Sequence, residues 1–339
     1  MSSYAKRKSP ESRLTVADAI AQAEEYMELR KFKSVGNHRV ALRRIQSEFG
    51  TRNLDELTAM DLERFLSGVR SRAQASPNAR RDRRAGDCSY RNHLGTLRLL
   101  YRVAMPDWRR NPAMRIPQLP RVRGTRTALE PNEVREVLRA ASVVGEDPAL
   151  NSILIRFHLE TAARRCGAVY LTLGDLLPSR GLVNVYQRGG GYSEVPLSQL
   201  LHREIVALAV SRGANPSDPT QRAFLKLNGR PVDARFYENL FPKIQECVGD
   251  EVPSGVTAHW FRHTTLTAVQ RRFGTEWAER YGCLSPQDGD ERQANRTIST
   301  YTKVTKSELL DLHDALFPMV PACPERWKAM ESQRRQEAA

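Results

Sequence analysis

The sequence predicts a multidomain, mainly α protein in which an all-α N-terminal domain precedes an α+β domain with a small antiparallel sheet. Apolar residues recur at helical spacing along most of the chain. Two short β-type segments, at 182–187 and 192–197, flank three consecutive glycines. Because a domain commonly holds roughly 150 residues, a chain of 339 residues suggests two domains. We place them at 14–105 and 127–317, joined by a linker at 106–126.

Four helices are expected in the N-terminal domain. The strings at 15–18 and 58–61 have a Thr-x-x-Asp pattern that resembles a capping box, so a helix is predicted to begin at each. The periodicity of apolar residues predicts two more helices, at 35–49 and 89–105. The residues expected to face inward from the helix at 35–49 are Val40, Ile45 and Phe49.

The linker at 106–126 is rich in proline and arginine. Proline removes a backbone donor and stiffens the chain, so this stretch is predicted to be extended. It could follow a phosphate backbone or serve as a plain spacer. The two ends of the chain are polar, and we expect a disordered N-terminus at 1–13 and a loose C-terminal tail at 318–339.

The second domain is expected to begin with helices at 131–142 and 148–162, the first of which has proline in its first turn. The two β-type segments then form a hairpin around Arg188-Gly-Gly-Gly191. A glycine cluster can also cradle a phosphate, but the pattern GxxxxGK(S/T) and its following helix are absent, which excludes a P-loop. Helices continue to about residue 317.

Net positive charge is concentrated in one part of the chain. The sequence has 53 Lys and Arg against 39 Asp and Glu, a formal net charge of +14. Between Arg70 and Arg126 there are 15 Arg, no Lys and three acidic residues, which gives +12 in 57 residues. Arginine donates two parallel hydrogen bonds to phosphate, so this segment favours a nucleic-acid partner over a solvated face or an anionic membrane. The arginines proposed to contact DNA are Arg39, Arg43, Arg91, Arg98, Arg121 and Arg123.

The sequence does not support a membrane, secreted or disulfide-rich protein. No run approaches the roughly 18 apolar residues needed to span a bilayer, and the first residues lack the apolar core of a signal peptide. The five cysteines have neither CxxC nor CxxH spacing, which argues against a zinc ribbon or a disulfide framework and fits a reducing compartment. We therefore expect a cytoplasmic protein without a membrane partner. The cysteines are Cys88, Cys166, Cys247, Cys283 and Cys323.

Two strings place basic side chains where they need an anionic partner. In His259-Trp-Phe-Arg262 the first and last residues are three positions apart and therefore share a helix face. Arg164 and Arg165 follow the apolar segment FHLETAA, and a buried arginine needs an anion or a carboxylate such as Asp175. A structural arginine or a core histidine would explain either string taken alone.

Two further strings lie at the hairpin and near the end of the second domain. Arg188 stands at the tip of the hairpin, and Val195-Pro196-Leu197 closes its second strand. Tyr301 lies among small polar residues in Thr297-Ile-Ser-Thr-Tyr301-Thr-Lys303-Val304. Arginines and tyrosines are common, so neither string is specific by itself.

In this order, the four strings resemble the tyrosine recombinase, or phage integrase, family, and the resemblance covers residues 14–317. A Thr-x-x-Arg string followed 11 residues later by Asp matches the family's first-arginine motif, which implies that Arg164, not Arg165, is the catalytic arginine. The string at 259–262 matches the family's His-x-x-Arg motif. Tyr301 matches the family's nucleophile.

The resemblance implies the chemistry of DNA strand transfer. Arg164 and Arg262 would hold the nonbridging phosphate oxygens, where the transition state concentrates negative charge, without a metal ion. Tyr301 would attack phosphorus to give a 3′-phosphotyrosyl enzyme and a free 5′-hydroxyl. His259 would act as a general acid or base, or would bind the phosphate. Because the covalent link conserves the bond energy, religation needs no ATP, and no cofactor is expected.

The resemblance also implies an architecture and partners. The N-terminal helices would form a SAM-like core-binding domain and the second domain would be catalytic, and together they would clamp double-stranded DNA at a specific recombination site. A monomer in solution would assemble into a homotetramer on DNA, with an accessory DNA-bending factor as a further partner. The protein would act in the cytoplasm, associated with the nucleoid, in integration, excision or resolution of a mobile element.

Several positions depart from the family pattern. Arg188 stands where the family usually has a hairpin lysine, and it is a poor proton donor because the pKa of arginine stays above about 12. Gly167 stands where an acidic residue is usual. At the family's second histidine or tryptophan position, the candidates are Cys283, within Tyr-Gly-Cys-Leu-Ser, and Arg292. Tyr281 is an alternative nucleophile.

These departures keep two other functions open. A DNA-binding accessory protein with a catalytically impaired recombinase fold would share the fold and lack the reaction. A topoisomerase-like enzyme would use the same chemistry to relax DNA without a paired site or a tetramer. The amphipathic helix expected after Tyr301, at 307–317, would either pack on its own domain or dock into a neighbouring subunit.

Overall fold

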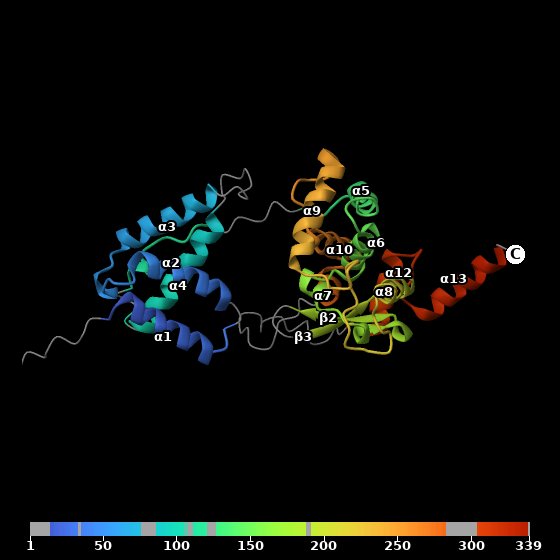
Figure 1. Ribbon diagram of the computed structural model, residues 1–339, viewed down its shortest axis with the longest axis horizontal. Coiled ribbons are helices and arrows are strands. Elements are labelled where there is room, and N and C mark those ends of the chain that lie inside the picture. The colour runs from blue at the N-terminus through green and yellow to red at the C-terminus, as the bar shows by residue number, and fades with distance from the viewer. Residues whose placement is uncertain are drawn as a thin grey trace, which may run out of the picture. The chain divides into compact units, whose positions relative to one another are not determined.

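A computed structural model describes residues 14–32, 35–75, 86–105, 107, 111–120, 127–187, 191–282 and 304–337 (Figure 1). The chain divides into two compact units, Met1–Gly124 and Thr125–Ala339. Each unit has its own apolar core. Among the helices of the described ranges, none is long and apolar enough to cross a lipid bilayer.

The described part of the first unit is helical, and its last long helix lies at the centre. The elements are α1 (Val16–Leu29), α2 (Val35–Phe49), η1 (Leu54–Glu56), α3 (Ala59–Gln74), α4 (Asp87–Ala104) and η3 (Pro112–Met114). α4 contacts α1, α2 and α3, and its Leu97, Leu100 and Tyr101 are fully buried. The Tyr101 hydroxyl donates to Leu54 O at 3.1 Å, which gives the buried phenol a partner.

The helix starts expected in this unit are confirmed, since Thr15 and Thr58 each form a capping box with the aspartate three residues later. The prediction that Val40 faces inward is wrong, because 46% of it is exposed. The buried residues of α2 are Ala41, Leu42, Ile45 and Phe49. Their spacing of three and four defines a helix face that Val40 does not share.

The described part of the predicted linker, residues 111–120, packs on the first unit. Ala113 and Ile116 are buried in its core. Arg98 of α4 donates from Nε to Ala113 O at 3.1 Å and from Nη2 to Ile116 O at 2.8 Å. This stretch is therefore a docked segment rather than the extended spacer expected from its prolines, because its apolar residues find a place in the helical core.

The second unit combines helices with a three-stranded antiparallel sheet of order β1-β2-β3, which confirms the predicted fold class. The strands are β1 (Leu176–Leu177), β2 (Leu182–Gln187) and β3 (Gly191–Pro196). The longer helices are α5 (Pro131–Ala141), α6 (Pro148–Thr161), α8 (Gln199–Ser211), α9 (Ala234–Val248), α10 (Ala258–Phe273), α12 (Lys306–Leu316) and α13 (Pro324–Glu337). The short helices are α7 (Arg165–Val169), α11 (Thr275–Tyr281), η4 (Leu173–Asp175), η5 (Pro178–Arg180) and η6 (Gly249–Glu251).

The helix α6 is the central element of this unit. It contacts α5, α7, α8, α10 and β3, and Figure 1 shows it beside α5 and α10. Leu154, Ile155 and Phe157 lie on different sides of the helix, and all three are fully buried. A helix that is apolar on all sides is a core helix, so whatever follows its C-terminal end begins inside the unit.

The helix α12 packs on its own unit. Leu309 and Leu312 lie in one apolar cluster with Val269 of α10 and with Ala278 and Tyr281 of α11. Of the two expectations for the helix after Tyr301, packing on its own domain is the one that this structure shows.

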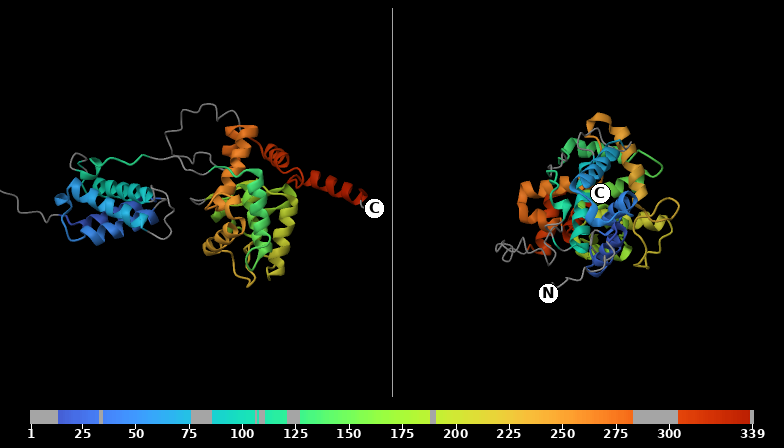
Figure 2. Two further views of the ribbon diagram at one scale, coloured as in Figure 1. Left: turned by 90° about the horizontal axis from the view of Figure 1, so that it is seen from above. Right: turned by 90° about the vertical axis from the view of Figure 1, so that its left-hand side faces the viewer.

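The prediction of a loose C-terminal tail is wrong, because residues 324–337 form α13, which extends away from the rest of the unit (Figures 1 and 2). Trp327 anchors it, with 5% of its surface exposed. The guanidinium of Arg203 lies 5.4 Å from the centre of the Trp327 ring and pairs with Glu331 at 2.7 Å. A buried aromatic residue and ion pairs made by Glu331 and Arg326 therefore fix a helix that is otherwise polar.

Candidate active site

The C-terminal end of α6 is completed by side chains from two other helices. The last carbonyl groups of a helix have no partner within the helix. Leu159 O accepts a hydrogen bond from the Thr265 hydroxyl of α10 at 2.6 Å. Glu160 O accepts one from the hydroxyl of Tyr281, the last residue of α11. These bonds join α6, α10 and α11 at one point in the core.

Arg262, the arginine of the His-x-x-Arg string, is fixed by two more carbonyls. Its Nη1 donates to Ala162 O, one residue beyond α6, at 2.6 Å, and its Nη2 donates to Gly282 O, one residue beyond α11. Only 4% of Arg262 is exposed. A guanidinium carries its five N–H donors in one plane, so two fixed carbonyls set the plane in which all of its donors point.

The chain turns sharply after α6 at Ala162, whose φ of 50° lies in the left-handed region. This conformation is uncommon for a residue with a side chain. Polar groups on both sides of the turn support it: Arg262 bonds Ala162 O, Ala163 N–H donates to Thr161 Oγ1 at 3.2 Å, and His158 Nδ1 lies 3.0 Å from Ala163 O. The segment 162–164 is therefore held from both sides.

His158 holds this segment as a neutral group. Because the Ala163 carbonyl can only accept, Nδ1 of His158 carries the proton, and Nε2 accepts from the Tyr237 hydroxyl at 2.9 Å. Burial lowers the pKa of His158 to about 4 and raises the pKa of Tyr237. Both groups are uncharged at neutral pH, so they position the segment without contributing charge to it.

Arg164, the arginine that the sequence motif singles out, ends this segment at the N-cap position of α7. Its side chain is half-buried, and its Nη1 donates to Gln187 Oε1 at 2.8 Å. Gln187 is the last residue of β2, pairs with Gly191 of β3 and immediately precedes Arg188 in the sequence. The fold therefore brings Arg164 to the strand end that leads into Arg188, which itself lies outside the described residues.

The close packing of α7 on β2 explains one departure from the family pattern. A Cβ atom added to Gly167 would lie 2.5 Å from Val185 Cγ1 and 3.3 Å from the Ala163 Cβ atom. Real Cβ atoms do not approach so closely, so a side chain at 167 would push α7 away from the sheet. The acidic residue that the family usually has here would not fit between α7 and β2 as they pack in this chain.

His259 lies in the first turn of α10 and is exposed, whereas Arg262, three positions later, is buried. Three positions along a helix bring two residues to one side of it. The start of α10 therefore offers one titratable group that solvent or a ligand can reach, next to a guanidinium whose position is fixed.

The other predicted catalytic residues, Arg188, Cys283 and Tyr301, lie outside the described residues, as does the alternative Arg292, and their roles stay predictions. The alternative nucleophile Tyr281 is described. It is fully buried, and its hydroxyl donates to the backbone of α6. A hydroxyl held in this way inside the core is not placed to attack a phosphodiester.

Three of the arginines predicted to contact DNA bind groups of the protein itself. Arg39 pairs with Glu28 at 2.7 Å, Arg91 donates to Pro120 O at 3.0 Å, and Arg98 holds the docked segment 111–120. Arg43 is exposed on α2, and Arg121 and Arg123 lie outside the described residues. A contact with DNA stays a prediction for all six.

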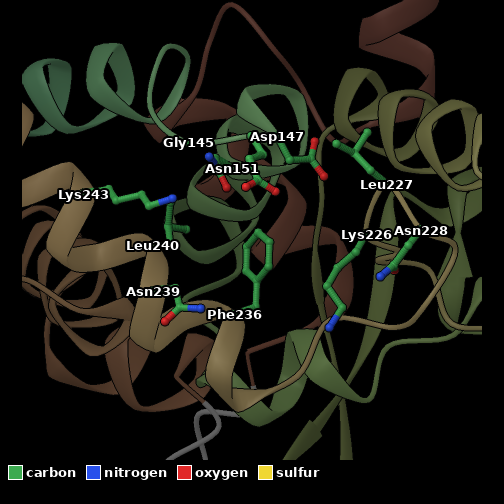
Figure 3. Close-up of a pocket in the computed structure, with 11 residues that line it drawn as sticks. Gly145, Asp147, Asn151, Lys226, Leu227, Asn228, Phe236, Asn239, Leu240 and Lys243 are labelled. Carbon is green, nitrogen blue, oxygen red and sulfur yellow. The ribbon is translucent and has the colours of Figure 1, made fainter.

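A separate pocket of about 320 Å³ lies at the opposite end of α6 (Figure 3). The Asp147 carboxylate there caps α6 through Leu150 N at 3.2 Å and pairs with Arg212 at 2.6 Å. The Asp147 carboxylate already caps this helix start, and the residues that line the pocket include none of the motif residues. The pocket is therefore not the candidate active site.

Within the described ranges, no group of three or more His, Cys, Asp or Glu side chains is arranged to hold a metal ion.

Solved structures of integrases share the arrangement of both units' elements. A lambda integrase tetramer bound to a Holliday junction matches with a TM-score of 0.63 and 14% identity, over 85% of this chain and 85% of that chain. The chain has the integrase fold. The Tn1549 transposon integrase in complex with circular intermediate DNA matches with a TM-score of 0.62 and 18% identity, over 87% of this chain and 97% of that chain. No protein-family model and no curated protein sequence matches.

Both integrases are tyrosine recombinases, so the resemblance inferred from the motifs is confirmed at the level of the fold. At 14% and 18% identity the likeness concerns the course of the chain and not the roles of single residues. The assignment of Arg164, His259 and Arg262 therefore depends on their motifs and on the geometry of the segment 162–164.

We expect Gly167→Ala to destabilise the second unit by about 1–3 kcal/mol, because the methyl group overlaps Val185. Urea denaturation of the full chain measures the change. The matched control is Gly95→Ala in α4, where an added Cβ meets nothing within 4 Å and alanine is the better helix former. Equal stability of the Gly167→Ala variant and the wild type would contradict the packing argument.

Proposed function

We propose that this protein is a site-specific DNA recombinase or integrase that cleaves and rejoins strands through a 3′-phosphotyrosyl intermediate on Tyr301. The observation that carries the proposal is that the Arg262 guanidinium bonds the backbone of the short segment that ends at Arg164. Arg164 ends the segment 162–164, and Arg262 bonds the first carbonyl of the same segment at 2.6 Å. The four motifs and the integrase fold, which are independent of each other, support the same function.

The proposed reaction needs stabilisation of negative charge and transfer of one proton. Tyr301 Oη would form a bond to phosphorus as the bond from phosphorus to the 5′ oxygen breaks. Arg164 and Arg262 would offset the charge on the nonbridging oxygens. His259, exposed at the start of α10, would exchange a proton with one of the reacting oxygens. Attack of a 5′-hydroxyl on the phosphotyrosine would rejoin a strand without ATP.

We infer double-stranded DNA as the partner and a homotetramer on DNA as the active assembly. The lambda integrase structure is a tetramer bound to a Holliday junction, and the Tn1549 integrase structure contains circular intermediate DNA. The net charge of +14 supports binding to a polyanion. Action on a mobile element, in a DNA-associated cytoplasmic location, belongs to the same proposal.

Covalent trapping tests this function. Wild type, Tyr301→Phe and Tyr192→Phe are incubated with nicked duplexes made from the DNA that flanks the gene, and the products are separated on denaturing gels. Tyr192, 60% exposed on β3, is a matched control because it is an accessible tyrosine to which the family resemblance assigns no role. We expect a protein–DNA adduct with wild type and with Tyr192→Phe, and none with Tyr301→Phe. Tight DNA binding without any adduct would instead support a catalytically impaired accessory protein.

The Arg188→Lys variant tests the departure at the hairpin. If position 188 serves the leaving 5′ oxygen, lysine should maintain or increase the rate of adduct formation, since its ammonium donates a proton far more readily than a guanidinium. Single-turnover kinetics on the nicked substrate measure this rate. The control is Arg230→Lys at an exposed position outside the motifs, and complete loss of cleavage in Arg188→Lys alone would show that arginine itself is required.

A further inference from the structure

Four buried titratable residues lie where α6, α8 and α12 meet, and the chemistry above uses none of them. They form what we call the Glu160 cluster: Glu160 of α6 (4% exposed), His202 of α8 (2%), His313 of α12 (0%) and Asp314 of α12 (7%). Charged groups are seldom so fully buried unless they are paired. The burial of these four groups therefore indicates a structural or functional role that the recombinase motifs do not explain.

Glu160 is the point at which three elements are joined. Its Oε2 accepts a hydrogen bond from Ser198 N, the N-cap of α8, at 2.9 Å. The same oxygen lies 3.6 Å from Nε2 of His313 in α12. Its backbone carbonyl accepts the Tyr281 hydroxyl. Glu160 stands four residues before Arg164. The interactions of its carboxylate with Ser198 and His313 therefore constrain the end of α6, which leads directly into the segment 162–164.

His313 continues this connection into the C-terminal part of the chain. Its Nδ1 lies 3.3 Å from Asp314 Oδ1, and that oxygen also accepts Ala322 N at 2.7 Å. Arg326 of α13 donates to Asp314 Oδ2 at 3.0 Å and also pairs with Asp311 of α12 at 2.6 Å. The imidazole therefore lies between two carboxylates, one on each side of the contact between α6 and α12.

The charges of the cluster depend on the proton of His313. Burial alone would lower the pKa of His313, but the carboxylates of Asp314 and Glu160 raise it above its ordinary value. Burial lowers the pKa of His202 to about 4, so this neighbour stays neutral. Bonds from His313, Ala322 N–H and Arg326 lower the pKa of Asp314 although burial opposes this. With His313 protonated, each buried carboxylate faces a cation.

We infer that Glu160 and His313 form a positioning pair that docks α12 on α6 and thereby fixes the helix that follows Tyr301 in the sequence. The inference rests on the proposed function. Tyr301 stands five residues before Lys306, the first residue of α12, and Arg164 stands four residues after Glu160. The pair thus connects the helix that follows Tyr301 in the sequence with the helix that leads to Arg164, beside the apolar cluster that Leu309 and Leu312 share with Ala162.

The pairing has a predictable dependence on pH. A histidine whose pKa is raised in the folded protein stabilises it fully below its ordinary pKa of about 6.5, and this contribution is lost as the pH rises through the raised value. Above that value, Glu160 and Asp314 would face a neutral ring in a buried site. The docking of α12 should therefore be strongest near pH 6 and weaken towards alkaline pH.

An ion pair at the start of α12, away from the Glu160 cluster, supplies a matched control. Lys306, at the start of the helix, pairs with Glu194 of β3. Lys306 is half exposed, with 52% of its side chain accessible, unlike the buried His313. Glu194→Gln therefore removes a carboxylate that pairs with the same helix but not with the buried histidine.

Hydrogen exchange of the α12 amides, corrected for the intrinsic effect of pH, tests the docking in the full chain between pH 6 and 9. We expect protection in wild type and Glu194→Gln to fall as the pH rises. In Glu160→Gln we expect protection at pH 6 to be lower by on the order of tenfold and to fall less steeply with pH, because Asp314 alone then raises the pKa of His313. His313→Gln, a second variant that removes the cation instead, should lower protection at pH 6 and abolish this pH dependence. The inference that Glu160 and His313 dock α12 would be contradicted by either of two results. One is protection of the wild-type α12 amides that does not change with pH, and the other is a pH profile in Glu160→Gln that equals that of wild type.

Adduct formation then distinguishes this inference from the proposed function. We expect Glu160→Gln to slow adduct formation on the nicked substrate at pH 6.5 without weakening DNA binding, and Glu160→Asp to restore part of the rate. Wild-type rates in Glu160→Gln, with wild type active, would overturn the positioning role and leave the recombinase proposal intact. If wild type forms no adduct, both the recombinase proposal and the positioning role of Glu160 are contradicted. This holds whatever the hydrogen exchange of the α12 amides shows.

Discussion

The candidate site depends on the unsatisfied carbonyl groups at the C-terminal end of α6. This helix lies in the core, so water cannot bond these groups, and a buried carbonyl without a partner is costly. Thr265, Tyr281 and Arg262 supply the missing donors from α10 and α11. The arginine of the His-x-x-Arg string is therefore a structural group as well as a candidate catalytic one: the bonds that complete α6 also hold Arg262 at the segment that leads into Arg164. The same bond therefore contributes to the folding of the second unit and to the placement of Arg262.

Local patterns predicted the parts of the fold that are governed by short-range chemistry. The Thr-x-x-Asp strings at 15–18 and 58–61 gave the starts of two helices, and the glycine cluster between two β-type segments gave the hairpin. Val40 was placed wrongly because the apolar pattern of α2 alone does not distinguish neighbouring faces of a helix. The tail at 318–339 was expected to be loose because its polar composition hides the buried Trp327, whose partner Arg203 lies far away in the sequence.

The sequence predicted which residues belong to the candidate site, but it did not predict the contacts between them. Motif order singled out Arg164 and Arg262, but nothing in the sequence indicates that Arg262 bonds Ala162 O, 100 positions away. The bond between Arg164 and Gln187 and the pair formed by Glu160 and His313 are also contacts between distant positions. Gly167 looked like a defect against the family pattern. In the structure it permits the contact between α7 and Val185, so it is a packing requirement of this chain.

We propose that the end of α6 directs Arg164 and Arg262 at one phosphate. A crystal structure of Tyr301→Phe bound to a duplex with the trapped cleavage sequence would test it most directly. We expect both guanidinium groups to lie within hydrogen-bond distance of nonbridging oxygens of the same phosphate, with Arg262 still bonded to Ala162 O. A complex in which the phosphate nearest residue 301 contacts neither arginine, or in which Arg262 only holds the backbone, would contradict it.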